Sequence, residues 1–146
     1  MNRGILRKHI CELSCALTVD VYGDFSAIVV RGFTTPPHYN KTIIDVRMDI
    51  PKDYPLRPPG LSPHRIYLPT GLLFKDRTPH DYHPGVGPPG WAWWCFEKIA
   101  WDPCRDDLIT LIELLRATMT DQSRRGSPGN AAGKETSKSW IQRLFE

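Results

Sequence analysis

The sequence has little that would place this protein in a membrane or on nucleic acid. No apolar run approaches the roughly 20 residues that span a bilayer. The N-terminus lacks the apolar core and the small-residue cleavage site of a signal peptide. The net charge is only +3, which is too balanced to indicate nucleic-acid binding. We therefore expect a cytoplasmic protein that binds neither a membrane nor nucleic acid.

Cysteine is also scarce, with four residues in a chain of 146. The four are Cys11, Cys15, Cys95 and Cys104. Without a secretory signal, reduced thiols are expected rather than disulfides. Zinc sites usually contain a CxxC pair or closely spaced histidines, whereas the spacings here are C-x3-C and C-x8-C. A zinc or redox protein is thus a weakly supported alternative, and we expect no metal and no cofactor.

Proline, by contrast, is abundant, with 14 residues. Proline interrupts helices and central strands, so much of the chain must be loop or strand edge. The length suits one domain with one core, which we place at residues 1–121. Residues 122–138 are polar and rich in Gly and Ser, which is typical of a flexible linker. Residues 139–146 end the chain as a short predicted helix.

Hydrophobic periodicity predicts a helix, a run of strands and a second helix. The predicted elements are a helix over 3–13, strands over 16–22, 25–33, 41–50 and 64–69, a long loop over 70–94, and a helix over 106–119. The strand over 41–50 and the helix over 106–119 each have one predicted core face, formed by Ile44, Val46, Met48 and Ile50 in the strand and by Leu108, Ile109, Ile112, Leu115 and Met119 in the helix. The short links between the strands favour an antiparallel meander. Residues 51–60 contain four prolines and are predicted to be a stiff extended arm. This order indicates an α+β fold.

Two segments have surfaces that could bind a partner. Arg3, Arg7 and Lys8 lie off the apolar stripe of the first helix, so they form either a solvated face or a docking face for an acidic partner. Trp140 and Phe145 belong to the apolar face of the C-terminal helix. That helix either packs on its own domain or docks on a partner.

Four motifs follow one another in a characteristic order. They are "IPKDYPLRPP" (50–59), His83-Pro84-Gly85, Cys95, and Trp101-Asp102-Pro103, and an apolar helix comes next. This order resembles that of the ubiquitin-conjugating enzyme family, which has "FPxDYPFxPP", His-Pro-Asn, a cysteine about ten residues later, and Trp-Ser-Pro eight residues after the cysteine. The resemblance covers residues 1–121, and the linker with one short helix looks like a diverged bacterial member. It implies a UBC-like fold with an N-terminal helix, a four-stranded antiparallel meander, a long proline-rich active-site loop, a core helix and a short C-terminal helix.

The His-Pro-Asn position has two alignments. In one, His83-Pro84-Gly85 takes it, and this alignment is preferred because the distance to Cys95 is closer to that of the family. In the other, "HRIYLPTG" (64–71) resembles the family's "TRIYHPNI", and Leu68-Pro69-Thr70 takes the position. An insertion of about a dozen residues relative to the family lies before His83 in the first alignment and before Cys95 in the second.

The resemblance implies a reaction at Cys95. A thiolate takes an acyl group from a thioester and passes it to an amine, because cysteine is both a good nucleophile and a good leaving group. His83 would orient the loop rather than act as a base. Gly85 stands where the family has asparagine, so what stabilises the oxyanion is open. Trp93 and Trp94 flank the thiol, either as core residues or as a surface platform.

Three more residues follow from the same resemblance. Trp101 would pack the active-site segment onto the core. Asp102 or Asp121 would orient the attacking amine, although each is also compatible with an ordinary surface charge. The implied partners are a ubiquitin-like protein or a target protein's C-terminus, an activating enzyme, and, as in bacterial antiphage systems, a cyclic-oligonucleotide synthase. A catalytically inactive binding module with the same fold is the alternative function.

Overall fold

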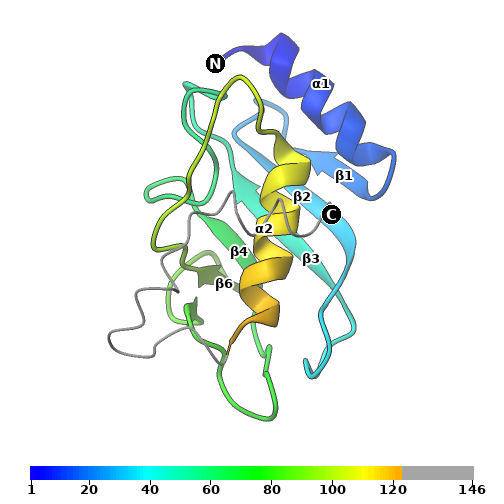
Figure 1. The fold of residues 1–146 in the computed structure, drawn as a ribbon, viewed down its shortest axis with the longest axis vertical. Helices are drawn as coiled ribbons and strands as arrows, with labels where there is room; N and C mark the ends of the chain where they lie inside the picture. Colours follow the sequence, from blue (N-terminus) through cyan, green and yellow to red (C-terminus); the bar gives the residue numbers. More distant parts are fainter. Residues whose placement is uncertain (123–146) are drawn as a thin grey trace.

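The structure is a computed structural model that describes residues 1–122. Within these residues the chain forms two helices and one six-stranded antiparallel sheet, an α+β architecture (Figure 1). The elements in chain order are α1 (Arg3–Ser14), β1 (Thr18–Val21), β2 (Ala27–Thr34), β3 (Ile43–Asp49), β4 (Ile66–Pro69), β5 (Tyr82–His83), β6 (Trp91–Trp94) and α2 (Leu108–Thr120).

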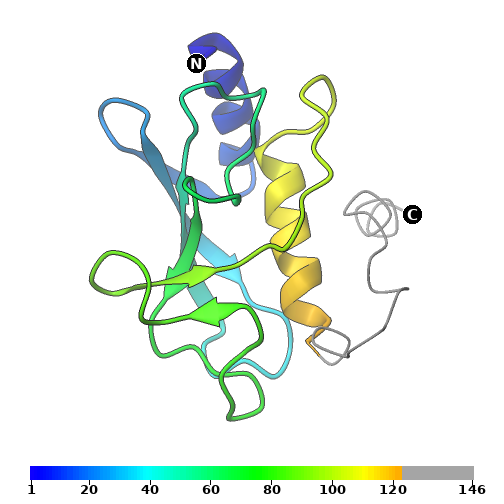
Figure 2. The same ribbon diagram turned by 90° about the vertical axis from the view of Figure 1, so that its left-hand side faces the viewer.

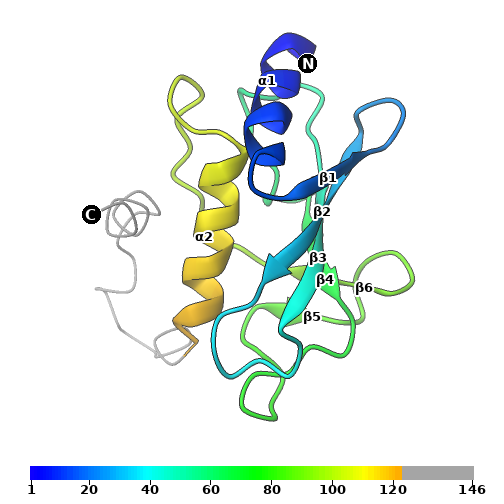
Figure 3. The same cartoon turned by 90° about the vertical axis from the view of Figure 1, so that its right-hand side faces the viewer.

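The strands lie in the order β1-β2-β3-β4-β6-β5. The first four form the predicted meander, and β6 then pairs with β4 while β5 forms the far edge. Figures 2 and 3 show α2 lying against one face of the sheet. We call the opposite face the open face. The loop that joins β5 to β6 projects on that side, away from α2 (Figure 3).

The side-chain alternation of β3 determines which face is buried. Ile44, Val46 and Met48 are at most 4% exposed, as their period-2 spacing predicts, whereas Ile43 is 66% exposed. Ile50, the last residue of the predicted series, is buried as well. This confirms the predicted core face of the strand over 41–50, although the strand itself is shorter than the prediction.

Both helices begin at a side-chain cap. The Asn2 carboxamide accepts a hydrogen bond from the Ile5 amide at the start of α1. Asp107 and Thr110 form a reciprocal capping box at the start of α2. The predicted start of the second helix at position 106 is thus two residues early, because Asp107 is the cap and lies outside the helix.

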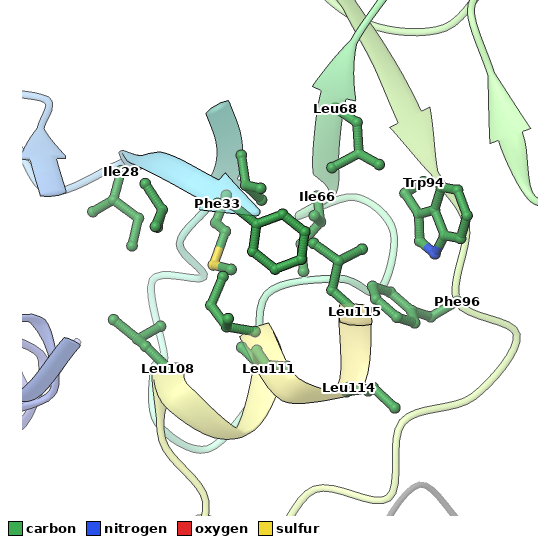
Figure 4. Close-up of a cluster of buried hydrophobic side chains, with 14 of the residues drawn as sticks. Ile28, Phe33, Ile66, Leu68, Trp94, Phe96, Leu108, Leu111, Leu114 and Leu115 are labelled. Carbon is green, nitrogen blue, oxygen red and sulfur yellow. The ribbon is translucent and has the colours of Figure 1, made fainter. Parts of the chain in front are cut away.

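The core lies between α2 and the sheet, and α1 closes one end of it. Figure 4 shows Leu111 and Leu115 of α2 directed toward strand residues that include Phe33 and Ile66. All four of these side chains are 0% exposed. The buried surface of α2 is wider than the predicted stripe, because Leu111 and Leu114 belong to it as well. Burial of this apolar surface is the main stabilising contribution of the domain.

One prediction about the fold is wrong. Residues 70–94 were expected to be a long loop, but they contain β5 and β6, so the sheet has six strands and not four. The sequence "WAWW" of β6 hides its alternation, because tryptophan occupies both faces and the polarity does not change along the strand. β5 has only two residues, which is too short for a periodic signal.

Two segments outside the sheet remain to be placed. Residues 51–60 contain neither helix nor strand, as the four prolines predict. Most of the predicted linker, the terminal helix, and its residues Trp140 and Phe145 lie outside the described residues. No helix within residues 1–122 is long and apolar enough to cross a membrane.

Candidate active site

Cys95 follows the last residue of β6 and lies on the open face of the sheet. The residues before and after it, Trp94 and Phe96, are buried, and Figure 4 shows both directed toward α2. Because successive side chains of an extended chain point to opposite faces, Cys95 lies on the same side as Trp93. Both of these residues are half-buried. Cys95 therefore lies directly after a strand at the edge of the open face, whereas the resemblance implies a position in a long active-site loop.

Backbone pairing holds Cys95 in this position. Its amide donates a hydrogen bond of 2.7 Å to the Asp81 carbonyl, which continues the β5–β6 ladder by one residue. β4 lies between β3 and β6. On the β3 side of β4, the Asp49 amide donates to the Arg65 carbonyl at 2.9 Å and continues the β3–β4 ladder by one residue. The β4–β6 register pairs Ile66 with Trp94. One further step in this register places Arg65 opposite Cys95.

Arginine side chains and aromatic rings lie next to one another in the rows beside Cys95. The strand registers align Arg47, Tyr67, Trp93 and His83 across β3, β4, β6 and β5. The Arg47 guanidinium carbon lies 5.9 Å from the Tyr67 ring centre, and that of Arg65 lies 4.5 Å from the Trp93 ring centre. The His83 ring is 5.0 Å from the Trp93 ring. We call these five residues the open-face cluster.

The open-face cluster contains unsatisfied hydrogen-bond donors. The buried Nε atoms of Arg47 and Arg65 and the Nε1 atom of Trp93 have no acceptor within residues 1–122. Arg47 has an ion-pair partner in Asp49, at 3.7 Å. Burial raises the pKa of Tyr67, the Asp49 carboxylate raises it further, and the charge of Arg65 acts in the opposite direction. These mutual effects confirm that the charged groups lie close together.

The two alignments of the His-Pro-Asn position lead to different surroundings. His83 is exposed and packs its ring on Trp93, while Leu68 is fully buried in the core. Gly85 lies in the loop that joins β5 to β6, and an added Cβ there would meet no atom within 4 Å. The hairpin register places that loop at one end of β6 and Cys95 at the other. The structure therefore brings His83 near the thiol through Trp93 but keeps Gly85 apart.

Two residues of the predicted Trp-Asp-Pro motif fix the chain between β6 and α2. The Trp101 indole N–H donates to the Pro55 carbonyl at 2.6 Å, so the segment is held against the proline-rich arm. The Asp102 amide donates to the Asp106 carboxylate at 2.6 Å, and the Asp102 carboxylate accepts from the Cys104 amide at 2.9 Å. Trp101 thus packs against the core and the proline-rich arm, and Asp102 stabilises the turn before α2.

Asp121 lies at the end of α2 that is linked to the Cys95 region. It forms the C-terminal cap of the helix. The adjacent Gln122 accepts a hydrogen bond of 2.6 Å from the His80 amide through its side-chain oxygen. His80 precedes Asp81, whose carbonyl holds Cys95. Of the two predicted carboxylates, Asp121 is the one whose chain neighbour, Gln122, is linked by a side-chain hydrogen bond to the segment that holds the Cys95 amide.

The basic face of α1 is exposed, and two of its arginines contact an aromatic ring. Arg3, Arg7 and Lys8 are all exposed, as their position off the apolar stripe predicts. The guanidinium carbons of Arg3 and Arg7 lie 5.5 and 5.3 Å from the Phe25 ring centre. This ring comes from the β1–β2 turn, so the two arginines form one surface with that turn.

All four cysteines lie in the described part of the chain, and none forms a disulfide. No group of three or more His, Cys, Asp or Glu side chains that could hold a metal ion occurs among residues 1–122. Comparisons with protein-family models, with curated proteins and with solved structures found no match for this chain. What the geometry offers chemically is a half-exposed thiol on a rigid sheet, with a cation and tryptophan beside it. Sequence reasoning missed Arg65, because β6, the strand that pairs with its neighbours in β4, was expected to belong to a loop over 70–94.

Proposed function

We propose that this protein carries a ubiquitin-like modifier, or the C-terminus of a target protein, as a thioester on Cys95 and transfers it to an amine. The observation that carries the proposal is the position of Cys95. Cys95 is half-buried and not enclosed in the core, and its amide is held by the Asp81 carbonyl directly after β6. A nucleophile needs both access and a fixed orientation, because misplacement of a reacting atom by about 1 Å can cost about 10²-fold in rate.

The reaction consists of two acyl transfers. In the first, the Cys95 thiolate attacks the carbonyl carbon of a donor thioester, the carbonyl oxygen becomes negative, and the donor thiolate leaves. In the second, an amine attacks the new thioester, a proton leaves the nitrogen, and the Cys95 thiolate is released. The product is an amide, so no oxidant, reductant or metal is required.

The arrangement of elements supports the resemblance to ubiquitin-conjugating enzymes. A helix, three strands of a meander, a proline-rich arm, the fourth strand, a cysteine-bearing segment and a core helix follow in the expected order. Trp101 links the segment after the cysteine to the arm at Pro55, which relates two of the four motifs in space. Burial of Trp94 and Phe96 on the α2 side leaves Cys95 on the opposite side.

Within this mechanism Asp121 is the residue we assign to the attacking amine. It lies at the α2 terminus that Gln122 links to His80. A carboxylate near the thioester would attract a protonated lysine and accept its proton. Asp102 is less suited, because its carboxylate already accepts the Cys104 amide and lies 3.8 Å from Arg105.

The partners follow from the same proposal. An activating enzyme would supply the donor thioester, and the surface of Arg3, Arg7 and Lys8 on α1 suits an acidic patch of that enzyme. A cyclic-oligonucleotide synthase is the proposed acceptor system, by similarity to bacterial antiphage conjugation. His83 would steady Trp93 beside the thiol through the ring contact between them.

The test is a transfer assay read by intact mass. The full chain is mixed with an activating enzyme, its ubiquitin-like modifier and ATP, and the products are weighed before and after treatment with a reductant. We expect one reductant-sensitive adduct, which Cys95→Ser converts to a reductant-resistant ester or abolishes. Cys104→Ser is the matched control, since Cys104 is exposed and lies in a turn outside the site. An adduct that persists unchanged in Cys95→Ser contradicts the proposal.

A second function, a catalytically inactive binding module, is favoured by one observation. The family's cysteine lies eight residues before its Trp-Ser-Pro motif, and here that position is Trp93, which forms the centre of the open-face cluster. Such a module would bind a partner while Cys95 stays unreactive. Native alkylation separates the two functions: rapid reaction of Cys95 supports the enzyme, and a rate far below that of Cys104 supports the module.

A further inference from the structure

Arg65 is an arginine on the open face without an acidic partner. Its guanidinium lies over the Trp93 ring, and it makes no ion pair within the described part of the chain. Its Nη2 atom lies 3.5 Å from the Ser62 hydroxyl, and its buried Nε atom has no acceptor among residues 1–122. Buried donors of charged groups are costly to leave unpaired, so this cation requires an explanation.

The register gives Arg65 one notable neighbour. Ile66 and Trp94 form the last pair of the β4–β6 ladder. The next residues are each held by their other neighbour, Arg65 by the Asp49 amide and Cys95 by the Asp81 carbonyl. One further step in the β4–β6 register places Arg65 opposite Cys95. Side chains directly opposite in an antiparallel pair have Cβ atoms about 4.5–5.5 Å apart. The ring contact with Trp93 confirms that Arg65 lies on the open face, where Cys95 also lies.

We infer that Arg65 is a charge-stabilising residue of the Cys95 site, which holds the thiolate and, during acyl transfer, the negative oxygen that develops beside it. Only the part of this inference that concerns acyl transfer rests on the proposed function. A positive charge beside a thiol favours the thiolate, which is the nucleophilic form. It also supplies the oxyanion stabilisation that Gly85, in place of the family's asparagine, cannot give.

Other charged groups around Cys95 act with or against Arg65. Those that face the thiol's surroundings from β3, β5 and the segment after β6 are Asp49, Asp81, His83, Glu97 and Lys98. Asp49 forms an ion pair with Arg47, and the charge of Arg47 offsets part of the effect that the Asp49 carboxylate has on Arg65. Asp81 directly precedes β5 and holds the Cys95 amide through its carbonyl, so its negative charge opposes the effect of Arg65.

The test is alkylation of Cys95 by iodoacetamide in the full chain with Cys11, Cys15 and Cys104 changed to serine, so that one thiol reacts. Arg65→Gln should slow the reaction at pH 7 by roughly three- to tenfold, as expected for removal of one nearby charge. The slowing should vanish at pH 10, where an ordinary thiol is ionised without help. Arg65→Lys keeps the charge and should stay within about twofold of the parent.

Arg47→Gln is the matched control. Arg47 also lies on an aromatic ring of the open face, and its buried Nε also has no hydrogen-bond acceptor within residues 1–122, but it forms an ion pair with Asp49 and its register partner is Tyr67. A normal rate in Arg65→Gln at pH 7, an equal slowing in Arg47→Gln, or a slowing that persists at pH 10 would overturn the inference. Alkylation needs no modifier, so an Arg65 effect without any thioester would sink the proposed function and leave the role of Arg65 intact.

Discussion

The two faces of the sheet are built from different chemistry. The face against α2 is aliphatic and aromatic, and residues such as Ile28, Val46 and Leu68 are 0% exposed. The open face carries arginines, a histidine, tryptophan and a thiol, with three buried donors left unpaired. Stability is therefore concentrated on one face, while the unsatisfied polar groups and Cys95 lie on the other.

A single segment shows the contrast most clearly. Along residues 91–96 the side chains alternate between half-buried and buried, so Trp94 belongs to the core and Trp93 to the open face. The Trp94 indole N–H donates to the Thr118 hydroxyl of α2 at 3.1 Å, whereas the Trp93 N–H has no acceptor within residues 1–122. Two adjacent residues of one type thus have opposite roles, and this comparison can be tested directly.

The largest expected effect is on the α2 side. Trp94→Ala should lower the free energy of unfolding by about 3–5 kcal/mol, because it removes a fully buried side chain and leaves a cavity. Trp93→Ala should cost roughly 1–2 kcal/mol, since it loses a half-buried ring and its contact with Arg65. Urea denaturation of both variants measures the difference. Equal losses would contradict the division between the two faces.

The next effect concerns the loop between β5 and β6. Gly87 has φ of +131°, and an added Cβ would lie 2.9 Å from the Tyr67 ring. Gly87→Ala should therefore destabilise the protein by more than about 1 kcal/mol and lift the loop from the open face. Gly85→Ala meets open space and should stay within about 0.5 kcal/mol of the parent. If thermal unfolding ranked the two variants the other way, the described loop geometry would be incorrect.

The smallest effect is at alkaline pH. Burial raises the pKa of Tyr54, which lies in the α2-side core, and burial also raises the pKa of Tyr67 on the open face. A raised pKa in the folded state stabilises the fold below the ordinary tyrosine pKa of about 10, and this contribution is lost as the pH rises further. Tyr54→Phe should flatten the alkaline decline in stability more than Tyr67→Phe. Urea denaturation of both variants between pH 8 and 11 measures this change. A larger effect of Tyr67→Phe than of Tyr54→Phe would contradict the prediction.

Much of the fold was predictable, because one-sided burial leaves a regular pattern in sequence. The strand over 41–50 alternates apolar and other residues, and its buried members were identified correctly. The same reasoning failed for β6, where Trp93 and Trp94 are both large and apolar although only Trp94 is in the core. Hydrophobicity cannot assign a face when both faces carry the same residue type.

The candidate site was less predictable for a related reason. Cys95 could be singled out from its place among the motifs, but its neighbours depend on which strands pair with β6. Arg65 and Asp81 become neighbours of Cys95 through the β4–β6 and β5–β6 registers. The hydrophobic pattern of one segment does not show how that segment pairs with another that is distant in sequence. Gly85 illustrates the converse, since its closeness to Cys95 in sequence does not make it a neighbour in the sheet.

The most direct test of the account is to locate the acyl group after transfer. The full chain is incubated with a ubiquitin-like protein prepared as a C-terminal thioester, quenched at low pH, digested, and mapped by mass spectrometry. The account predicts that the acyl group is on Cys95, in a reductant-sensitive linkage, and not on the exposed Cys11, Cys15 or Cys104. An even distribution over the four thiols, or labelling of the three exposed ones alone, would contradict it.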